Sequence, residues 1–213
     1  MIILIGSQKG GCGKSTLAIN IAALLAGWGK DVMLVDADRQ ATASAWVQER
    51  EELTDVPVIN SVQKYDNIAK SLQDLDKRYE FVVVDAAGRD SRELRTAMLV
   101  AHKMIVPFRP SQADLNTLPK MQEMIVAAQD MNSDLEVFGL LTMAPTNPIV
   151  SESDEAEELM SEFYTEIPMI DVKVCDRKVY RDSMADGKGV TEMSNHKATK
   201  EIKLVAARIG LGE

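Results

Sequence analysis

Short apolar runs alternate along the chain with longer stretches in which apolar residues recur at helical spacing. The apolar runs predict strands at residues 2–5, 32–36, 57–59, 81–85, 104–107 and 137–143. The longer stretches predict one helix that begins near Ser15 and five more that cover residues 41–52, 66–77, 91–101, 113–131 and 151–163. Strands that alternate with helices at this spacing indicate right-handed βαβ units. The pattern therefore predicts an α/β fold with a mainly parallel, twisted sheet and helices on both faces.

The segment after the first predicted strand is rich in glycine and lysine. Residues 7–16 read Ser-Gln-Lys-Gly-Gly-Cys-Gly-Lys-Ser-Thr and stand between a strand and a helix, as a phosphate-binding loop does. Its glycines let backbone N–H groups approach an anion, and the helix N-terminus adds a positive dipole end. Lys14 supplies a charge for the outer phosphates, and the Ser15 hydroxyl suits a magnesium ligand. The residues expected to bind a nucleoside triphosphate are Gln8, Lys9, Gly10, Gly11, Cys12, Gly13, Lys14, Ser15 and Thr16.

Two further predicted strands end in carboxylates. One ends at Asp36, with Asp38 two residues later, and another ends at Asp85. In open α/β sheets, ligands bind at the carboxyl ends of the strands. Asp85 matches a Walker B carboxylate, which holds magnesium opposite Ser15. For Asp36 and Asp38 a second interpretation stays open, because aspartate also commonly caps the helix that follows.

The stretch Lys-Gly-Gly-Cys-Gly-Lys-Ser-Thr at residues 9–16 resembles the deviant Walker A box of the ParA/MinD family of ATPases. The resemblance implies a Rossmann-like P-loop NTPase that uses ATP and Mg²⁺. It also implies that Lys9 reaches across a two-fold dimer to the partner's nucleotide, although a lysine that is merely solvated would look the same in sequence. By the same resemblance Asp38 orients the attacking water and Asp36 supports the magnesium shell. The expected catalytic residues are thus Lys9, Lys14 and Asp38, and the expected metal-binding residues are Ser15, Asp36 and Asp85.

The chain departs from that family's usual pattern at three places. Arg39 replaces a proline, residues 86–87 are alanines where Thr-Pro is usual, and residues 142–143 lack the usual asparagine. The lost proline leaves the shape of its loop open, and the missing asparagine leaves the adenine contacts open. The loop at 144–148, which follows a predicted strand, is a candidate to border the base.

Length and composition fit one compact domain over residues 1–213, with 46% hydrophobic and 27% charged residues. The two cysteines form no Cys-x-x-Cys pair and the two histidines are isolated, which argues against a zinc or iron–sulfur site. No apolar run approaches the length of a membrane span, and the first strand follows Met1 directly, without a leader pattern. A cytoplasmic location is therefore expected.

The net charge of −9 opposes uniform attraction to nucleic acid, but the charge is uneven. From Asp171 onward the chain has nine Lys or Arg residues against seven acids. Residues 197, 200 and 203 share one face of a predicted helix, opposite an apolar face. In ParA relatives basic residues of this segment bind DNA without reading its sequence, which implies DNA binding by Arg177, Lys178, Arg181, Lys197, Lys200 and Lys203. A solvated helix face is the alternative.

The family resemblance implies a ParA-type ATPase for plasmid or chromosome partition. Such a protein forms a homodimer with ATP sandwiched between its subunits, binds double-stranded DNA in the nucleoid, and hydrolyses ATP when a centromere-binding, ParB-like partner engages it. A MinD-like regulator at a membrane or protein scaffold is the alternative, but the final residues lack the bulky aromatic residues and dense basic face of a membrane-binding helix. A metabolic P-loop synthetase would have no use for Lys9.

Overall fold

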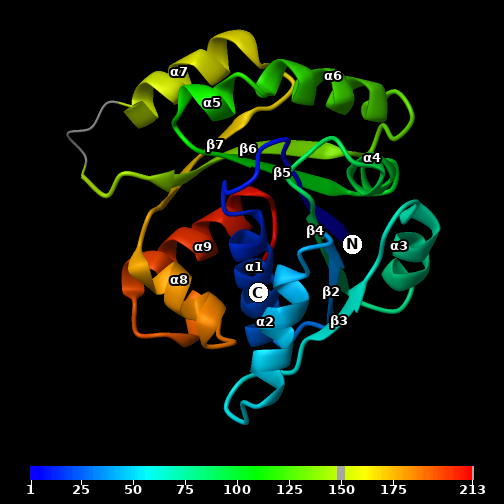
Figure 1. Ribbon diagram of the computed structural model, residues 1–213, viewed down its shortest axis with the longest axis vertical. Helices are drawn as coiled ribbons and strands as arrows, with labels where there is room; N and C mark the ends of the chain where they lie inside the picture. Colours follow the sequence, from blue (N-terminus) through cyan, green and yellow to red (C-terminus); the bar gives the residue numbers. More distant parts are fainter. Residues whose placement is uncertain (148–151, 213) are drawn as a thin grey trace.

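The computed structural model describes residues 1–147 and 152–212, which include a seven-stranded sheet (Figure 1). Its strands are β1 (Ile2–Ile5), β2 (Val32–Ala37), β3 (Asn60–Gln63), β4 (Phe81–Ala86), β5 (Lys103–Phe108), β6 (Glu136–Ala144) and β7 (Met169–Cys175). All neighbours pair in parallel, in the order β3-β2-β4-β1-β5-β6-β7. The chain first builds the sheet to one side of β1 and then to the other. The carboxyl end of β1 therefore lies where a doubly wound sheet binds its ligand.

Helices cover both faces of the sheet (Figure 1). They are α1 (Lys14–Gly27), α2 (Thr42–Glu51), α3 (Ala69–Asp76), α4 (Arg92–Met98), α5 (Gln112–Leu115), α6 (Leu118–Gln129), α7 (Glu152–Phe163), α8 (Lys178–Ala185) and α9 (His196–Arg208), with a 3₁₀ turn at Val190–Glu192. In the described ranges no helix has the length and apolar composition that crossing a bilayer requires.

Both faces of the sheet are apolar because both are covered. In β1, Ile3 and Ile5 pack into the core formed with α1, α2 and α9. The alternate residues Ile2 and Leu4 pack into the core formed with α3, α4 and α6. A strand buried on both sides needs an unbroken apolar run, which is the pattern in the sequence. The predicted α/β fold, with a parallel sheet between two layers of helices, is confirmed.

Two predicted elements were wrong in position. The strand expected at 57–59 lies at Asn60–Gln63, where it pairs with β2 at the edge of the sheet. An edge strand need not be apolar, and this one is largely exposed. The long helix expected over 113–131 is divided into α5 and α6, because Pro119 lies in the first turn of α6. Proline has no N–H for a helix interior and starts a new helix instead.

The sequence reading also missed two elements, β7 and α8. In β7 the alternating Ile170, Val172 and Val174 are buried, whereas the residues between them are more exposed. This period of two was the signal for a strand. The consequence for the site is large, because β7 and α8 bring the C-terminal segment next to the N-terminus of α1.

Candidate functional site

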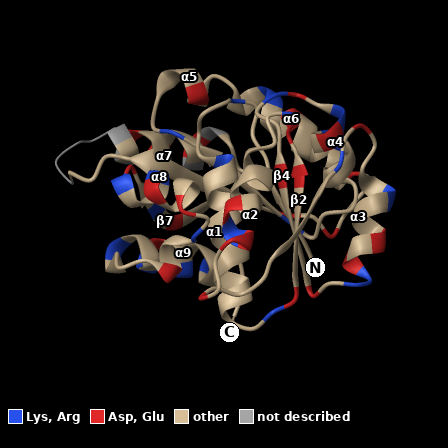
Figure 2. Cartoon of the chain, turned by 60° about the horizontal axis from the view of Figure 1, so that its bottom comes forward, with Lys and Arg blue, Asp and Glu red and all other residues tan. Residues whose placement is uncertain are grey.

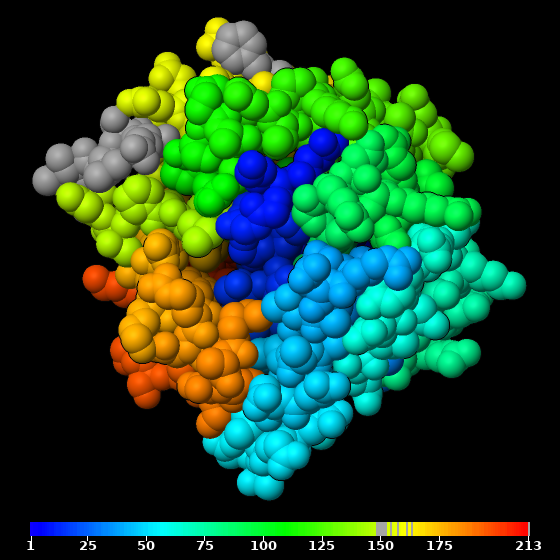
Figure 3. All heavy atoms as spheres, viewed as in Figure 1, coloured from blue at the N-terminus to red at the C-terminus, as the bar shows by residue number. Residues whose placement is uncertain are grey.

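The glycine-rich loop between β1 and α1 forms one wall of a cleft of about 560 Å³. Gly11 and Gly13 have positive φ angles of 76° and 83°, a conformation that L side chains rarely adopt. A Cβ atom at Gly10, Gly11 or Gly13 would meet nothing within 4 Å, so the loop backbone faces open space. In Figure 3 the loop and the start of α1, in dark blue, lie in a hollow between α2 and α8. Backbone N–H groups at such a place suit an anion.

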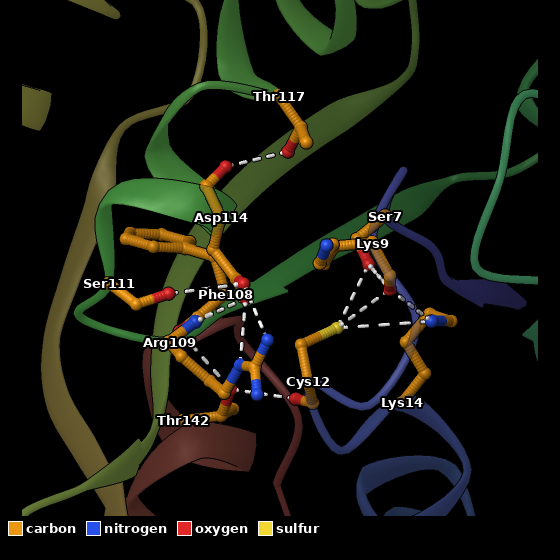
Figure 4. A network of polar contacts seen from close by, with 10 residues as sticks. All are labelled: Ser7, Lys9, Cys12, Lys14, Phe108, Arg109, Ser111, Asp114, Thr117 and Thr142. Atoms are coloured by element: carbon orange, nitrogen blue, oxygen red, sulfur yellow. Dashed lines mark hydrogen bonds and ion pairs between the residues drawn. The ribbon is translucent and has the colours of Figure 1, made fainter.

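Lys14 begins α1 and lies inside the loop. Its side chain is buried, and Nζ donates a hydrogen bond to the Lys9 carbonyl oxygen over 2.8 Å (Figure 4). Ser7 Oγ donates to the same carbonyl over 3.2 Å. The loop therefore holds the ammonium group of Lys14 at the floor of the cleft, where Ser15 and Thr16 also lie.

Lys9 differs from Lys14 in what its side chain contacts. The backbone of Lys9 closes the loop around Lys14, but in the described part of the chain its own ammonium group has no carboxylate partner within ion-pair distance. The side chain is partly exposed. The loop backbone thus fixes Lys14 within the subunit, whereas the ammonium group of Lys9 forms no ion pair with any described residue.

Asp36 and Asp38 have different surroundings. Asp36 is fully buried and accepts hydrogen bonds from the backbone N–H groups of Asp38 (3.1 Å) and Ser44 (2.8 Å). It thereby fixes both the loop and the first turn of α2, so the capping interpretation holds for Asp36. Asp38 lines the cleft, and its Oδ1 accepts a local hydrogen bond from the Gln40 N–H over 3.0 Å. The Asp38 carboxylate is therefore placed to contact a ligand.

Asp85 is a buried carboxylate with a strongly raised pKa. It is fully buried, pairs in register with Asp36 on the neighbouring strand, and neither of its oxygens lies within hydrogen-bond geometry of a donor among the described residues. Burial raises the pKa of Asp85 to about 7, and the Asp36 charge acts in the same direction, with Ser15 and Lys14 offsetting only part of the effect. Figure 2 shows the acidic ends of β2 and β4 side by side. Unpartnered carboxylate oxygens beside a serine hydroxyl and a phosphate site fit Mg²⁺, which prefers oxygen ligands.

Gly88 packs against the phosphate loop. A Cβ atom there would lie 2.6 Å from Lys14 Nζ and 2.8 Å from Gly10 Cα. No side chain fits between β4 and the loop at this position. Arg89 and Arg39 also line this cleft. The Arg39 guanidinium carbon lies 4.8 Å from the centroid of the Tyr65 ring.

A second, mostly apolar pocket of about 120 Å³ adjoins the cleft and shares Gly13, Thr16, Met143 and Met184 with it. Its wall also includes Val174, Tyr180 and Ile202, which do not line the cleft. Thr142 ties this wall to the loop, since its Oγ1 donates to the Cys12 carbonyl over 2.7 Å. The loop at 144–148 was the candidate to border the base. Its described residues 144–147 do not line this pocket, and residue 148 lies outside the described ranges. The ends of β6 and β7 and the helix α8 line this pocket instead.

The predicted DNA-binding residues fall into two groups. Lys197, Lys200 and Lys203 are exposed on α9, opposite its buried face, and form no ion pair within the described residues. The other three are paired with acids near the start of α8 or on α9, as Arg177 with Glu201 (2.6 Å), Lys178 with Asp182 (2.8 Å) and Arg181 with Asp176 (2.6 Å).

Arg177 has a structural role that sequence reasoning missed. Its guanidinium is largely buried, and Glu201 accepts hydrogen bonds both from it and from the Tyr180 hydroxyl, which lies 2.9 Å away. This network holds α8 against α9 beside the apolar pocket. The charge of Arg177 is therefore used within the chain, whereas Lys178 and Arg181 remain largely exposed.

Comparisons with known proteins agree with this geometry. The family model described as the CobQ/CobB/MinD/ParA nucleotide binding domain matches residues 3–190. Maintenance of carboxysome distribution protein A from Halothiobacillus neapolitanus is 29% identical over 195 residues, covering 90% of this chain and 87% of the relative. The chromosome-partitioning ATPase Soj from Thermus thermophilus is 28% identical over 187 residues, covering 73% of this chain and 74% of the relative.

Solved structures share the fold. Apo McdA from Cyanothece superimposes with a TM-score of 0.79 at 15% identity, covering 98% of this chain and 99% of the other. The septum site-determining protein MinD from Pyrococcus horikoshii, complexed with Mg-ADP, gives a TM-score of 0.75 at 17% identity, covering 98% and 95%. The predicted Rossmann-like P-loop NTPase fold is confirmed.

Proposed function

Because this chain belongs to the CobQ/CobB/MinD/ParA family of nucleotide-binding domains, we propose that it is a ParA-type ATPase, a switch that dimerises around ATP and binds DNA without reading its sequence. Its cargo is a DNA molecule or a large protein body. The relatives support both, since one is named for chromosome partitioning and another for carboxysome distribution.

In this proposal the cleft binds Mg-ATP. The backbone of Gly10 to Gly13 and the Lys14 ammonium group hold the phosphates, and Ser15 and Asp85 hold magnesium, with Asp36 keeping the surrounding loop in place. Bound magnesium would supply positive charge between the outer phosphates. Asp38 is the residue of the cleft whose carboxylate is free to position the attacking water. The adjoining apolar pocket takes the base.

Lys9 is the residue that makes a dimer necessary. A single triphosphate site needs one lysine in the loop, and Lys14 already fills that role. Across a two-fold axis, Lys9 of each subunit would contribute its charge to the phosphates bound by the other. Neither site would then be complete in a monomer, which couples ATP binding to dimerisation.

DNA binding is assigned to the exposed lysines of α9, aided by Lys178 and Arg181 on α8. Phosphate contacts require positive charge and little shape, so unpaired lysines on one helix face suffice. A ParB-like partner bound to the cargo would stimulate hydrolysis and release the subunits from DNA in the cytoplasm. The proposal is carried by one observation above the others, the presence of two lysines in one phosphate loop. Within the described residues, the loop backbone holds Lys14, whereas Lys9 has no ion-pair partner.

Size-exclusion chromatography with ADP and with a non-hydrolysable ATP analogue tests the proposal, followed by DNA binding of each fraction at several salt concentrations. We expect a dimer with the analogue only, and DNA binding by that dimer. Lys9→Ala should retain analogue binding yet remain monomeric, whereas Lys14→Ala should lose the analogue itself. A Lys9→Ala protein that still dimerises with the analogue would refute the sandwich arrangement.

The MinD-like alternative predicts binding to liposomes instead of DNA. The apolar residues Ile209 and Leu211 after α9 are buried in the core, so they offer no apolar face to a bilayer. Co-sedimentation of the analogue-bound protein with anionic liposomes or with DNA separates the two functions.

A further inference from the structure

Asp38 lies in a tight turn that follows β2. The N–H of Ala41 donates to the Asp38 carbonyl oxygen over 2.9 Å, which closes a β-turn with Arg39 and Gln40 at its centre. Within the same turn the Asp38 Oδ1 accepts the Gln40 N–H over 3.0 Å. The direction of the Asp38 carboxylate therefore depends on the conformation of this turn.

The turn is not one that its own residues favour. Ala41 has a φ angle of 53°, in the left-handed region that residues with side chains rarely adopt. Arg39 occupies the first central position of the turn, where proline is favoured because its ring fixes φ in advance. Arginine has no such ring, and the turn therefore needs a restraint from another part of the chain.

The Arg39 side chain supplies that restraint. Its guanidinium carbon lies 4.8 Å from the centroid of the Tyr65 ring, within the range of a cation–π contact. Glu93, in the first turn of α4, adds an opposite charge. Although burial acts to raise the pKa of Glu93, hydrogen bonds such as that from the Asp66 backbone, together with the charge of Arg39, hold this pKa below its usual value. Arg39 thus connects the turn after β2 with the loop after β3.

The loop that carries Tyr65 is itself fixed on both sides of the ring. Before it, the Lys64 N–H donates to the Asp36 carbonyl oxygen over 3.0 Å. After it, the Asp66 N–H donates to Glu93 Oε1 over 2.8 Å. Tyr65 is partly buried. A ring held by both of its neighbours is a firm platform, so the stack restrains the turn and does not merely follow it.

We propose that Arg39 is a positioning residue for Asp38 and acts through its stack on Tyr65, a role that rests on the proposed function of Asp38 in hydrolysis. The stack keeps the turn in one conformation and the carboxylate directed at the cleft. Arg39 itself also lines the cleft, so direct contact of its guanidinium with a phosphate is the competing interpretation. In that case the Tyr65 ring would only hold the guanidinium back, and removing the ring would not slow hydrolysis.

Basal ATP hydrolysis and analogue binding test the proposal. An exposed cation–π contact shifts an equilibrium about two- to fivefold. Arg39→Ala and Tyr65→Ala should therefore each lower kcat about two- to fivefold, while the Kd of the non-hydrolysable ATP analogue changes less than about twofold. The double variant should lose no more than either single variant, because the two side chains form one contact. Tyr65→Phe, which retains the ring, and Lys70→Ala, on the exposed side of α3, are the matched controls and should hydrolyse ATP at the wild-type rate.

Arg39→Pro separates positioning from phosphate contact. The Arg39 N–H donates no hydrogen bond within the described residues, so proline fits the turn and restrains it without a charge. We expect Arg39→Pro to keep kcat within about twofold of the wild type and to make Tyr65→Ala harmless when the two are combined. The proposal fails if Arg39→Pro loses as much activity as Arg39→Ala. It fails equally if Tyr65→Ala leaves kcat unchanged while Arg39→Ala weakens analogue binding.

Hydrogen exchange measured by NMR makes the test independent of hydrolysis. The Ala41 amide is bonded to the Asp38 carbonyl, so in the nucleotide-free protein it should exchange about two- to fivefold faster in Arg39→Ala and Tyr65→Ala than in the wild type. Faster exchange in a protein that hydrolyses no ATP would uphold the restraint on the turn and remove the proposed function. Conversely, a wild-type ATPase whose variants show unchanged exchange and unchanged kcat would retain the proposed function and lose this inference.

Discussion

Replacing Asp85 by asparagine should make the nucleotide-free protein more stable. Asp85 is fully buried and has no hydrogen-bond partner among the residues that the structure describes, and burial raises its pKa from 3.8 to about 7. Between these values the folded chain keeps a proton that the unfolded chain releases, so the free energy of unfolding falls as the pH rises. The full penalty, present above pH 7, is about 4 kcal/mol at 1.36 kcal/mol per pKa unit. Asparagine carries no charge and avoids it.

The measurement is urea denaturation in EDTA at pH 8, 6 and 4.5, followed by circular dichroism. At pH 8 we expect the variant to exceed the wild type by up to about 4 kcal/mol, with the difference shrinking toward zero near pH 4. Asp74→Asn on the exposed surface of α3 is the matched control and should show no such pH dependence. Saturating Mg-ATP should narrow the difference, because ligand at 100 times Kd stabilises the wild type by about 2.7 kcal/mol and the variant less.

A variant that is no more stable than the wild type at pH 8 would refute the reasoning. It would mean that the carboxylate oxygens of Asp85 are satisfied in the folded protein. The fit of magnesium to this site would then lose its structural basis.

Three further predictions concern the loop, the core and the basic helix. Gly88→Ala should abolish binding of an ATP analogue in calorimetry, since its Cβ would lie 2.6 Å from Lys14 Nζ, whereas Gly27→Ala, with open space around it, should bind normally. Glu192→Gln should lower the free energy of unfolding by about 3–5 kcal/mol, because it leaves the buried Arg50 guanidinium without its counter-charge; a loss below 1 kcal/mol would contradict this. The third change replaces three α9 lysines, Lys197, Lys200 and Lys203, by alanine. The slope of log K for DNA binding against log salt should then become shallower by about 2.7; an unchanged slope would place DNA elsewhere.

Local patterns in the sequence determined the layers of the fold and the phosphate loop. Unbroken apolar runs predicted the parallel strands because a strand covered on both faces has no polar side. The loop was readable because its glycines and Lys14 must stand at fixed offsets around an anion. Asp85 could be predicted because a carboxylate at the carboxyl end of a parallel strand lies at the same edge of the sheet as the phosphate loop. Each of these depends on neighbours within one segment.

The tertiary structure decided which charges are free and which surfaces are left open. Arg177 and Lys200 look alike in sequence, but Glu201 neutralises Arg177 from 24 residues away while Lys200 faces solvent. In the sequence Gln8 is one residue of the phosphate loop, and only the folded chain places Met124 Sδ 2.9 Å from its Nε2. Contacts between distant segments depend on how the layers pack, and no local pattern specifies that packing.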